Sequence, residues 1–258
     1  MNRRPLIIAN WKMHFDFVEA IHLVQQIGVL LRSKSHDNVD IVVAPPFVDI
    51  RSVASVIEAD RLPLAVGAQH VNALESGAYT GEVSASMLRR LMVKFVLVGH
   101  SERRTLFSMT GDIVAETAAA CLRHGITPVV CVGENSDERE GGTHREFVEQ
   151  QLTETLRFLE GLAGSIVVAY EPLWAIGTGK VASTGEVDEM SKLIRATLAQ
   201  HQRGESHILY GGSVKTDNAA ELITIADIDG FLIGGASLKA ESFVEIVSQS
   251  SDCYGKKR

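Results

Sequence analysis

Short runs of β-branched and other apolar residues recur along the chain, and each run is apolar nearly throughout instead of alternating with polar residues. Continuous apolar runs of this length indicate strands that are covered on both faces, as in a parallel sheet. The runs are Leu6–Ala9, Val39–Ala44, Leu64–Gly67, Phe95–Gly99, Thr127–Val132, Ile166–Tyr170, His207–Tyr210 and Gly230–Ile233.

Segments with helical periodicity lie between these runs. Over Val18–Leu31, apolar side chains recur at Val18, Ile21, Val24 and Ile27, which together form one face of a helix. The same pattern predicts helices over Ile113–Arg123, Glu146–Leu159, Glu186–Ala199, Asn218–Ile223 and Glu241–Val247. The alternation of strands and helices favours βα units joined by right-handed crossovers.

The number and size of these units predict an α/β fold of the (β/α)8 barrel type, with eight parallel strands inside an outer ring of helices. Eight runs in 258 residues give about 32 residues for each unit, the usual size of one βα step. An open, doubly wound sheet is the alternative, because alternation alone does not distinguish closed sheets from open ones. No segment resembles a linker, so we expect one domain over residues 1–258.

Composition and charge narrow the classes of function. The formal net charge of −7 disfavours a nucleic-acid partner, because phosphate backbones require a basic surface. The three cysteines include no CxxC pair, which argues against a zinc site or a disulfide framework. No apolar run approaches the ~18 residues of a membrane span. We therefore expect a cytoplasmic protein with no zinc site, no nucleic-acid partner and no membrane partner.

Chemically active residues follow five of the predicted strands. In a closed barrel these strand ends share one rim, where active sites are built. Taken alone, Glu171 or His100 is more often structural than catalytic, and Glu102 and Arg103 suggest an ion pair within a first helical turn. The five strand ends are Asn10–Lys12, Gly99–Arg103, Glu171, Gly211–Ser213 and Gly234–Gly235.

The glycines after the last two strands predict an anion site. Gly211, Gly212, Gly234 and Gly235 let backbone N–H groups approach a phosphate closely, and Ser213 adds a hydroxyl donor. A helix that begins after Gly235 would add its positive end. The G-x-G-x-x-A match at residues 177–182 does not predict dinucleotide binding, because five residues separate Glu171 from its first glycine.

The segment AYEPLWAIGTGK, residues 169–180, places bulky apolar side chains in a predicted loop. Leu173, Trp174 and Ile176 would gain nothing from exposure to water, so the loop is either permanently buried or closes over a ligand. Pro172 would stiffen one end, and the glycines at 177 and 179 would loosen the other. These glycines favour the hypothesis of a lid that excludes water from the site.

Six motifs resemble those of triosephosphate isomerases, from Leu6 to about Val247. The resemblance implies a homodimeric TIM barrel that interconverts dihydroxyacetone phosphate and glyceraldehyde 3-phosphate without a metal or cofactor. The motifs are NWKM (10–13), GAYTGEVS (77–84), VGHSERR (98–104), YEPLWAIGTGK (170–180), YGGSV (210–214) and GGASL (234–238).

The resemblance also implies roles for individual residues. Glu171 matches the family's base, His100 its electrophile and Lys12 its essential lysine, with Asn10 beside the substrate. The positions that match the family's phosphate-binding residues are Gly177, Ser213, Gly234 and Gly235. Two alternatives stay open: an isomerase of the same fold that acts on a tetrulose phosphate, and a barrel that binds sugar phosphates without catalysis.

The loop over residues 69–82 implies a dimer through the same resemblance. Residues 76–81 of one chain would pack near residues 10–14 of the other, whereas a loop packed on its own monomer is the alternative. The chain departs from the family at His14, which replaces the usual Asn, and at His70, where Asn or Asp is frequent. A buried His14 would weaken the dimer in acid.

Overall fold

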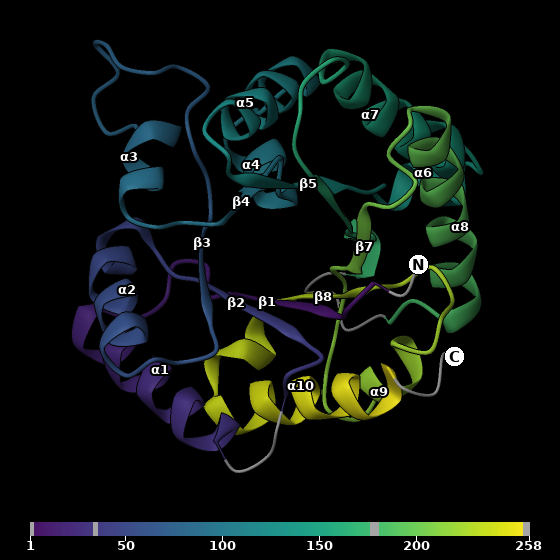
Figure 1. Cartoon of the computed structure of the whole chain (residues 1–258). Helices are drawn as coiled ribbons and strands as arrows, with labels where there is room; N and C mark the ends of the chain where they lie inside the picture. Colours follow the sequence, from purple (N-terminus) through teal and green to yellow (C-terminus); the bar gives the residue numbers. More distant parts are fainter. Residues whose placement is uncertain (1–2, 33–35, 176–180, 255–258) are drawn as a thin grey trace.

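A closed barrel of parallel strands forms the centre of the computed structural model, which describes residues 3–32, 36–175 and 181–254. The strands pair in sequence order and β1 also pairs with β8, so the sheet has no free edge (Figure 1). The predicted (β/α)8 barrel is therefore confirmed, and the open-sheet alternative is wrong. The strands are β1 (Leu6–Asn10), β2 (Asp40–Ala44), β3 (Ala65–Ala68), β4 (Phe95–Val98), β5 (Thr127–Val132), β6 (Val167–Tyr170), β7 (His207–Tyr210) and β8 (Gly230–Ile233).

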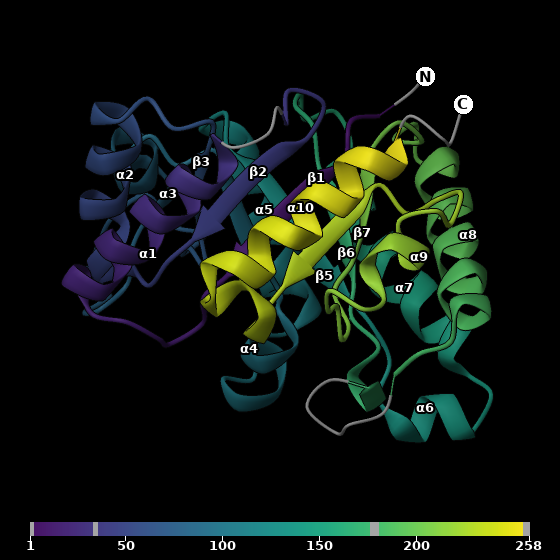
Figure 2. The same ribbon diagram turned by 90° about the horizontal axis from the view of Figure 1, so that it is seen from below.

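Helices surround the barrel, and Figure 2 shows α10 crossing the outside of the strands beside α9. No helix within the three described ranges is long and apolar enough to cross a bilayer. The α-helices are α1 (Phe17–Leu31), α2 (Ile50–Ala59), α3 (Ala85–Arg90), α4 (Ser101–Leu106), α5 (Gly111–Arg123), α6 (Ser136–Glu140), α7 (His144–Phe158), α8 (Thr184–Gln200), α9 (Ala219–Leu222) and α10 (Ala240–Tyr254). Short 3-10 helices are η1 (Phe47–Asp49), η2 (Leu173–Ala175) and η3 (Gly235–Leu238).

Capping explains where helices begin relative to the apolar pattern. α1 begins at Phe17 because the side chain of Asp16 accepts the N–H groups of Val18 and Glu19, and Glu19 bonds back to the Asp16 N–H. A similar box between Ser183 and Glu186 begins α8 two residues before the predicted start. Apolar periodicity therefore finds the body of each helix, and the capping residues set its end.

Two layers of apolar side chains hold the barrel together. Successive residues of a strand point to opposite faces, so one set fills the interior and the other set packs against the helices. In β1, Leu6 and Ile8 point inward, while Ile7 and Ala9 contact the helical layer. The interior set is Leu6, Ile8, Val42, Ala44, Leu97, Val129, Cys131, Val167, Ala169, Leu209 and Leu232. This double coverage explains why the strands appear as continuous apolar runs.

The seam between β1 and β8 requires a glycine. Leu6 pairs with Gly230, whose φ of +154° lies outside the range that L side chains ordinarily adopt. A Cβ at this position would lie 1.9 Å from the Leu6 carbonyl oxygen. A side chain there would push the first and last strands apart.

We predict that Gly230→Ala destabilises the fold by about 3 kcal/mol or more, because it combines backbone strain with a clash against the main chain. Urea unfolding followed by circular dichroism measures the change. Gly185→Ala is the matched control, since no atom lies within 4 Å of the Cβ that it adds near the start of α8. Equal midpoints for the two variants would contradict the role of Gly230 in closure.

Candidate active site

A cavity of about 500 Å³ opens at the carboxyl ends of the strands. Residues that follow β1, β4, β6, β7 and β8 line it, so the five predicted strand ends do converge. Gly177 lies outside the described residues, and every other candidate residue lies at this cavity. The lining residues are Asn10, Lys12, His100, Glu171, Gly211, Gly212, Ser213, Val214, Lys215, Leu232, Gly234, Gly235 and Ala236.

Glu171 follows β6 directly, and its side chain is only 2 % exposed. The backbone N–H of Ser101, at the start of α4, donates to Oε2 at 2.9 Å. Oε1 lies 3.1 Å from Nε2 of His100. Neighbouring glycines make room for this residue, since a Cβ on Gly133 would lie 1.8 Å from its carbonyl oxygen and one on Gly211 would lie 3.0 Å from its Cγ.

His100 occupies the N-cap position of α4, which fixes the orientation of its ring. The backbone N–H of Glu102 donates to Nδ1 at 3.3 Å. A ring nitrogen that accepts a hydrogen bond carries no proton, so the ring N–H is at Nε2. The only N–H of this tautomer is therefore the one that faces Glu171.

Lys12 is held by its main chain as well as by its side chain. Its φ is +53°, its N–H donates to Asn10 Oδ1 at 3.0 Å, and its carbonyl accepts from Gln69 Nε2 at 2.7 Å. The ammonium lies 2.5 Å from Oε1 of Glu102. A Cβ on Gly234 would be 3.3 Å from Lys12 Cε, so this glycine leaves space for the lysine stem.

The ion pair expected between Glu102 and Arg103 is wrong, because Glu102 turns toward Lys12 instead. The Arg103 guanidinium lies over the ring of Phe107, 4.5 Å from its centroid. Gln69 and Glu102 are the site residues that sequence reasoning missed. Glu102 was visible as part of the strand-end motif, but only the fold brings it to Lys12, which lies 90 positions earlier.

The loops after β7 and β8, where the sequence predicts an anion site, meet at the cavity. Ser213 and the pairs Gly211–Gly212 and Gly234–Gly235 lie together at the cavity. The expected helix begins at Gly235 but is the four-residue 3-10 helix η3, and α10 follows it. Ser237 fixes the turn, since both its N–H and its hydroxyl donate to the Gly234 carbonyl.

The apolar segment after Glu171 is anchored in the described part of the chain. Glu134 is fully buried, and its Oε1 accepts hydrogen bonds from the Tyr170 hydroxyl at 3.0 Å and from the Trp174 indole at 2.8 Å. The guanidinium of Arg139 lies over the Trp174 ring. Burial raises the pKa of Glu134, and the two donors oppose that rise. Residues 176–180, which the lid hypothesis also needs, lie outside the described residues.

Comparison with known proteins identifies the family. The sequence model described as triosephosphate isomerase matches residues 5–250. The chain belongs to the triosephosphate isomerase family. It is 50 % identical to the triosephosphate isomerase of Rhodococcus jostii (strain RHA1) over 251 residues, which cover 95 % of this chain and 96 % of the relative. The relatives from Nocardia farcinica and Corynebacterium glutamicum are 49 % and 46 % identical, over 95 % and 97 % of this chain and 96 % and 99 % of their own lengths.

One thiol of this family member lies in the barrel interior near Glu171. Burial, followed by the negative charge of Glu171, raises the pKa of Cys131 well above its ordinary value. Burial also raises the pKa of Cys121 to about 12. Both thiols therefore stay protonated at neutral pH, and neither presents a reactive thiolate.

We predict that one thiol of the three in each chain reacts with an aromatic disulfide reagent at pH 8 in the native protein. Cys253 is the expected site because it is half-exposed, whereas the other two are buried. Absorbance measures the released thiolate, and all three cysteines should react in denaturant. Loss of the fast phase in Cys253→Ser would confirm the assignment, and rapid native reaction of Cys131 would contradict it.

Proposed function

We propose that the chain is a triosephosphate isomerase that interconverts dihydroxyacetone phosphate and D-glyceraldehyde 3-phosphate through an enediolate. One observation carries the proposal: a buried carboxylate and a ring N–H, 3.1 Å apart, share a cavity with a lysine and a glycine cradle. The names of the relatives support the same reaction. Neither the tetrulose phosphate reaction nor binding without catalysis has a specific observation in its favour.

Glu171 is the proposed base. It takes a proton from the carbon next to the carbonyl group, and the electrons of that C–H bond form the C=C bond of the enediolate. The protonated carboxyl group then returns the proton to the neighbouring carbon. At the same time the hydroxyl proton moves from the first enediolate oxygen to the second, which leaves a carbonyl group at the first carbon and a hydroxyl group at the second. A carboxylate can reach both carbons from one place, and the Ser101 N–H holds it there.

His100 and Lys12 are the proposed stabilisers of the developing oxyanion. The Nε2–H of His100 faces the cavity beside Glu171, where it can donate to either oxygen of the enediolate. The Lys12 ammonium adds a positive charge beside the same cavity. The Asn10 amide is proposed to touch the substrate, and its oxygen also keeps the backbone of Lys12 in position.

The phosphate group is proposed to lie in the cradle after β7 and β8, against Ser213, Gly234 and Gly235. Short side chains let N–H groups approach its oxygens. Gly177 is carried over from the family alone.

No cofactor is proposed, and we infer that residues 1–258 act as one domain in the cytoplasm. Three free thiols fit a reducing compartment.

A homodimer through loop 69–82 is part of the proposal. Figure 1 shows the chain between β3 and α3 extending away from the barrel. In this loop Leu74 and Tyr79 are half-exposed, and Met13 is 94 % exposed. Apolar side chains presented in this way are typical of an interface. His14 is also exposed in the single chain, so it could lie at such a contact.

His70 at the base of the loop lies 3.7 Å from Glu82. Burial, followed by the charge of Arg103, lowers its pKa from 6.5 to about 4. The unfolded chain therefore binds this proton more readily than the folded one. Stability is expected to decline as the pH falls from 6.5 towards 4, because over this range the unfolded chain gains the proton on His70 and the folded chain does not.

A coupled assay with D-glyceraldehyde 3-phosphate tests the function, with tetrulose phosphates as controls. We predict that the wild-type protein turns over the triose phosphate and that Glu171→Gln lowers kcat by about 10²–10⁴-fold, because an amide cannot take the proton. Glu140→Gln is the control, since it alters an exposed glutamate. A Glu171→Gln variant that keeps more than about a tenth of kcat would remove the residue from the role of base. Preference for a tetrulose phosphate would favour the alternative substrate.

Sedimentation at micromolar concentration tests the assembly. We predict a single species of twice 28.0 kDa, which Tyr79→Asp converts to monomer with loss of activity, because the new charge would be buried in the contact. Val29→Asp is the control, since it places the same charge at an exposed apolar position on α1. A fully active 28.0 kDa wild-type monomer would refute the arrangement.

A further inference from the structure

Three charged side chains line the cavity, apart from His100: Lys12, Glu171 and Lys215. Lys12 forms an ion pair with Glu102 at 2.5 Å, and Glu171 bonds the Ser101 N–H. Among the described residues, no hydrogen bond or ion pair engages the ammonium of Lys215. With Glu102 included, the paired groups and Glu171 sum to one negative charge. Lys215 is thus the unengaged cation at a site proposed to receive a phosphate dianion.

The main chain of Lys215 is fixed although its side chain is exposed. Its N–H donates to Asn218 Oδ1 at 2.8 Å, and the amide of Asn218 donates to the Ser213 carbonyl at 2.9 Å. Gln249, on α10, donates to the Thr216 carbonyl. These contacts hold the segment after β7 against the barrel, so the Lys215 stem begins at a defined place beside Ser213 in the cradle.

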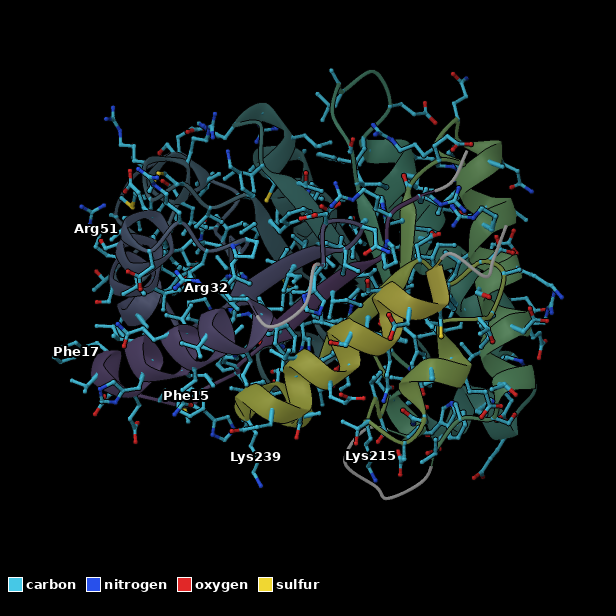
Figure 3. All side chains as sticks on the ribbon, turned by 60° about the horizontal axis from the view of Figure 1, so that its bottom comes forward. Phe15, Phe17, Arg32, Arg51, Lys215 and Lys239 are labelled. Atoms are coloured by element: carbon cyan, nitrogen blue, oxygen red, sulfur yellow. The ribbon has the colours of Figure 1, made fainter. Side chains whose placement is uncertain are left out.

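We propose that Lys215 draws the phosphate group of the substrate to the cradle and favours substrates that carry a dianion. The inference rests on the proposed function. The chain as a whole carries a net charge of −7, which repels a dianion at long range. Lys215, which has no hydrogen-bond or ion-pair partner among the described residues, opposes that repulsion locally, because it places a positive charge where the cavity opens to solvent. Figure 3 shows Lys215 projecting from the same end of the molecule as Lys239.

From this position Lys215 would affect the step in which the substrate first binds. Its effect falls on kcat/KM, because the charge acts before the carbon–hydrogen bond breaks. It also depends on salt, because the side chain is exposed and solvent ions screen exposed charges. Replacing a solvent-exposed lysine that has no role in substrate capture would change neither kcat/KM nor its dependence on salt.

Lys239 provides a matched control. It is another exposed lysine at this end of the molecule, it follows η3, and it does not belong to the cavity lining. Lys239→Gln removes the same charge from the whole protein as Lys215→Gln. The comparison therefore separates a charge at the cavity from a change in net charge.

The test measures kcat and kcat/KM for D-glyceraldehyde 3-phosphate at ionic strengths of about 0.01 M and about 1 M, where the Debye lengths are about 30 Å and about 3 Å. At low salt, Lys215→Gln should lower kcat/KM about 3- to 10-fold while kcat stays within about twofold, and Lys215→Glu should lower it further. Lys215→Arg should restore the wild-type value. The difference should nearly vanish at high salt, and Lys239→Gln should have a much smaller effect.

Two results would overturn the proposal. Equal kcat/KM for Lys215→Gln and Lys239→Gln at low salt would show no special role for the cavity position. A loss that persists at high salt and appears in kcat would indicate a structural role instead. Calorimetric titration with inorganic phosphate supplies a readout apart from catalysis: Lys215→Gln should bind it more weakly than Lys239→Gln does. If the wild-type protein fails to isomerise the triose phosphate, the proposed function falls, and the titration still decides the role of Lys215.

Discussion

Closure of the sheet between β1 and β8 is the constraint on which the rest of the structure depends. At this seam Gly230 lies so close to the Leu6 carbonyl that no side chain fits. The consequence appears at the other end of the same two strands, where Lys12 follows β1 and Gly234 follows β8. A Cβ on Gly234 would lie 3.3 Å from Lys12 Cε, so the glycine leaves space for the lysine stem. A glycine near one end of the barrel therefore helps to position a charged group at the other end.

Two carboxylates in or beside the site, Glu171 and Glu134, are buried, and each has specific hydrogen-bond partners. A buried carboxylate is costly unless hydrogen bonds replace its water. One oxygen of Glu171 receives the Ser101 N–H, while the other faces the Nε2–H of His100. The first contact fixes the carboxylate, and the second places the other oxygen beside the imidazole at the cavity. Glu134 differs, because Tyr170 and Trp174 both donate to one oxygen and use it as an anchor.

The fold was largely predictable because both faces of each strand are covered. Each strand therefore appears in the sequence as a continuous run of apolar residues. Helices were less predictable where they are stabilised by capping hydrogen bonds and do not have a periodic apolar face. α6 has no apolar face, and a capping box between Asn135 and Glu138 begins it. α2 does carry apolar residues at Ile50 and Val53, a periodic signal that could have been found. Strand ends were displaced by one residue at most, because the apolar pattern stops where the barrel rim begins.

Residues of the candidate site were predictable where an ionisable side chain comes within two residues of the end of a strand, as Glu171 and His100 do. Contacts between segments far apart in the chain were not predictable, because they depend on the fold and leave no pattern in the local sequence. Glu102 illustrates this limit: a neighbouring arginine suggested an ion pair, yet the carboxylate pairs with Lys12 instead. Gln69 likewise resembles any polar loop residue until its amide is seen bonding the carbonyls of Lys12 and Ala44.

The net negative charge of the chain makes the positive groups at the site important for binding an anionic substrate. An acidic protein that takes a dianion cannot rely on its overall field, so attraction must come from groups at the site. Backbone N–H groups at the glycine cradle act only at contact distance, and salt hardly weakens them there. The ammonium of Lys12 is partly neutralised by Glu102. Attraction beyond contact distance is the role that we propose for Lys215. It is an exposed lysine of the cavity lining with no hydrogen-bond or ion-pair partner among the described residues, and Asn218 and Gln249 bond the main chain of its segment.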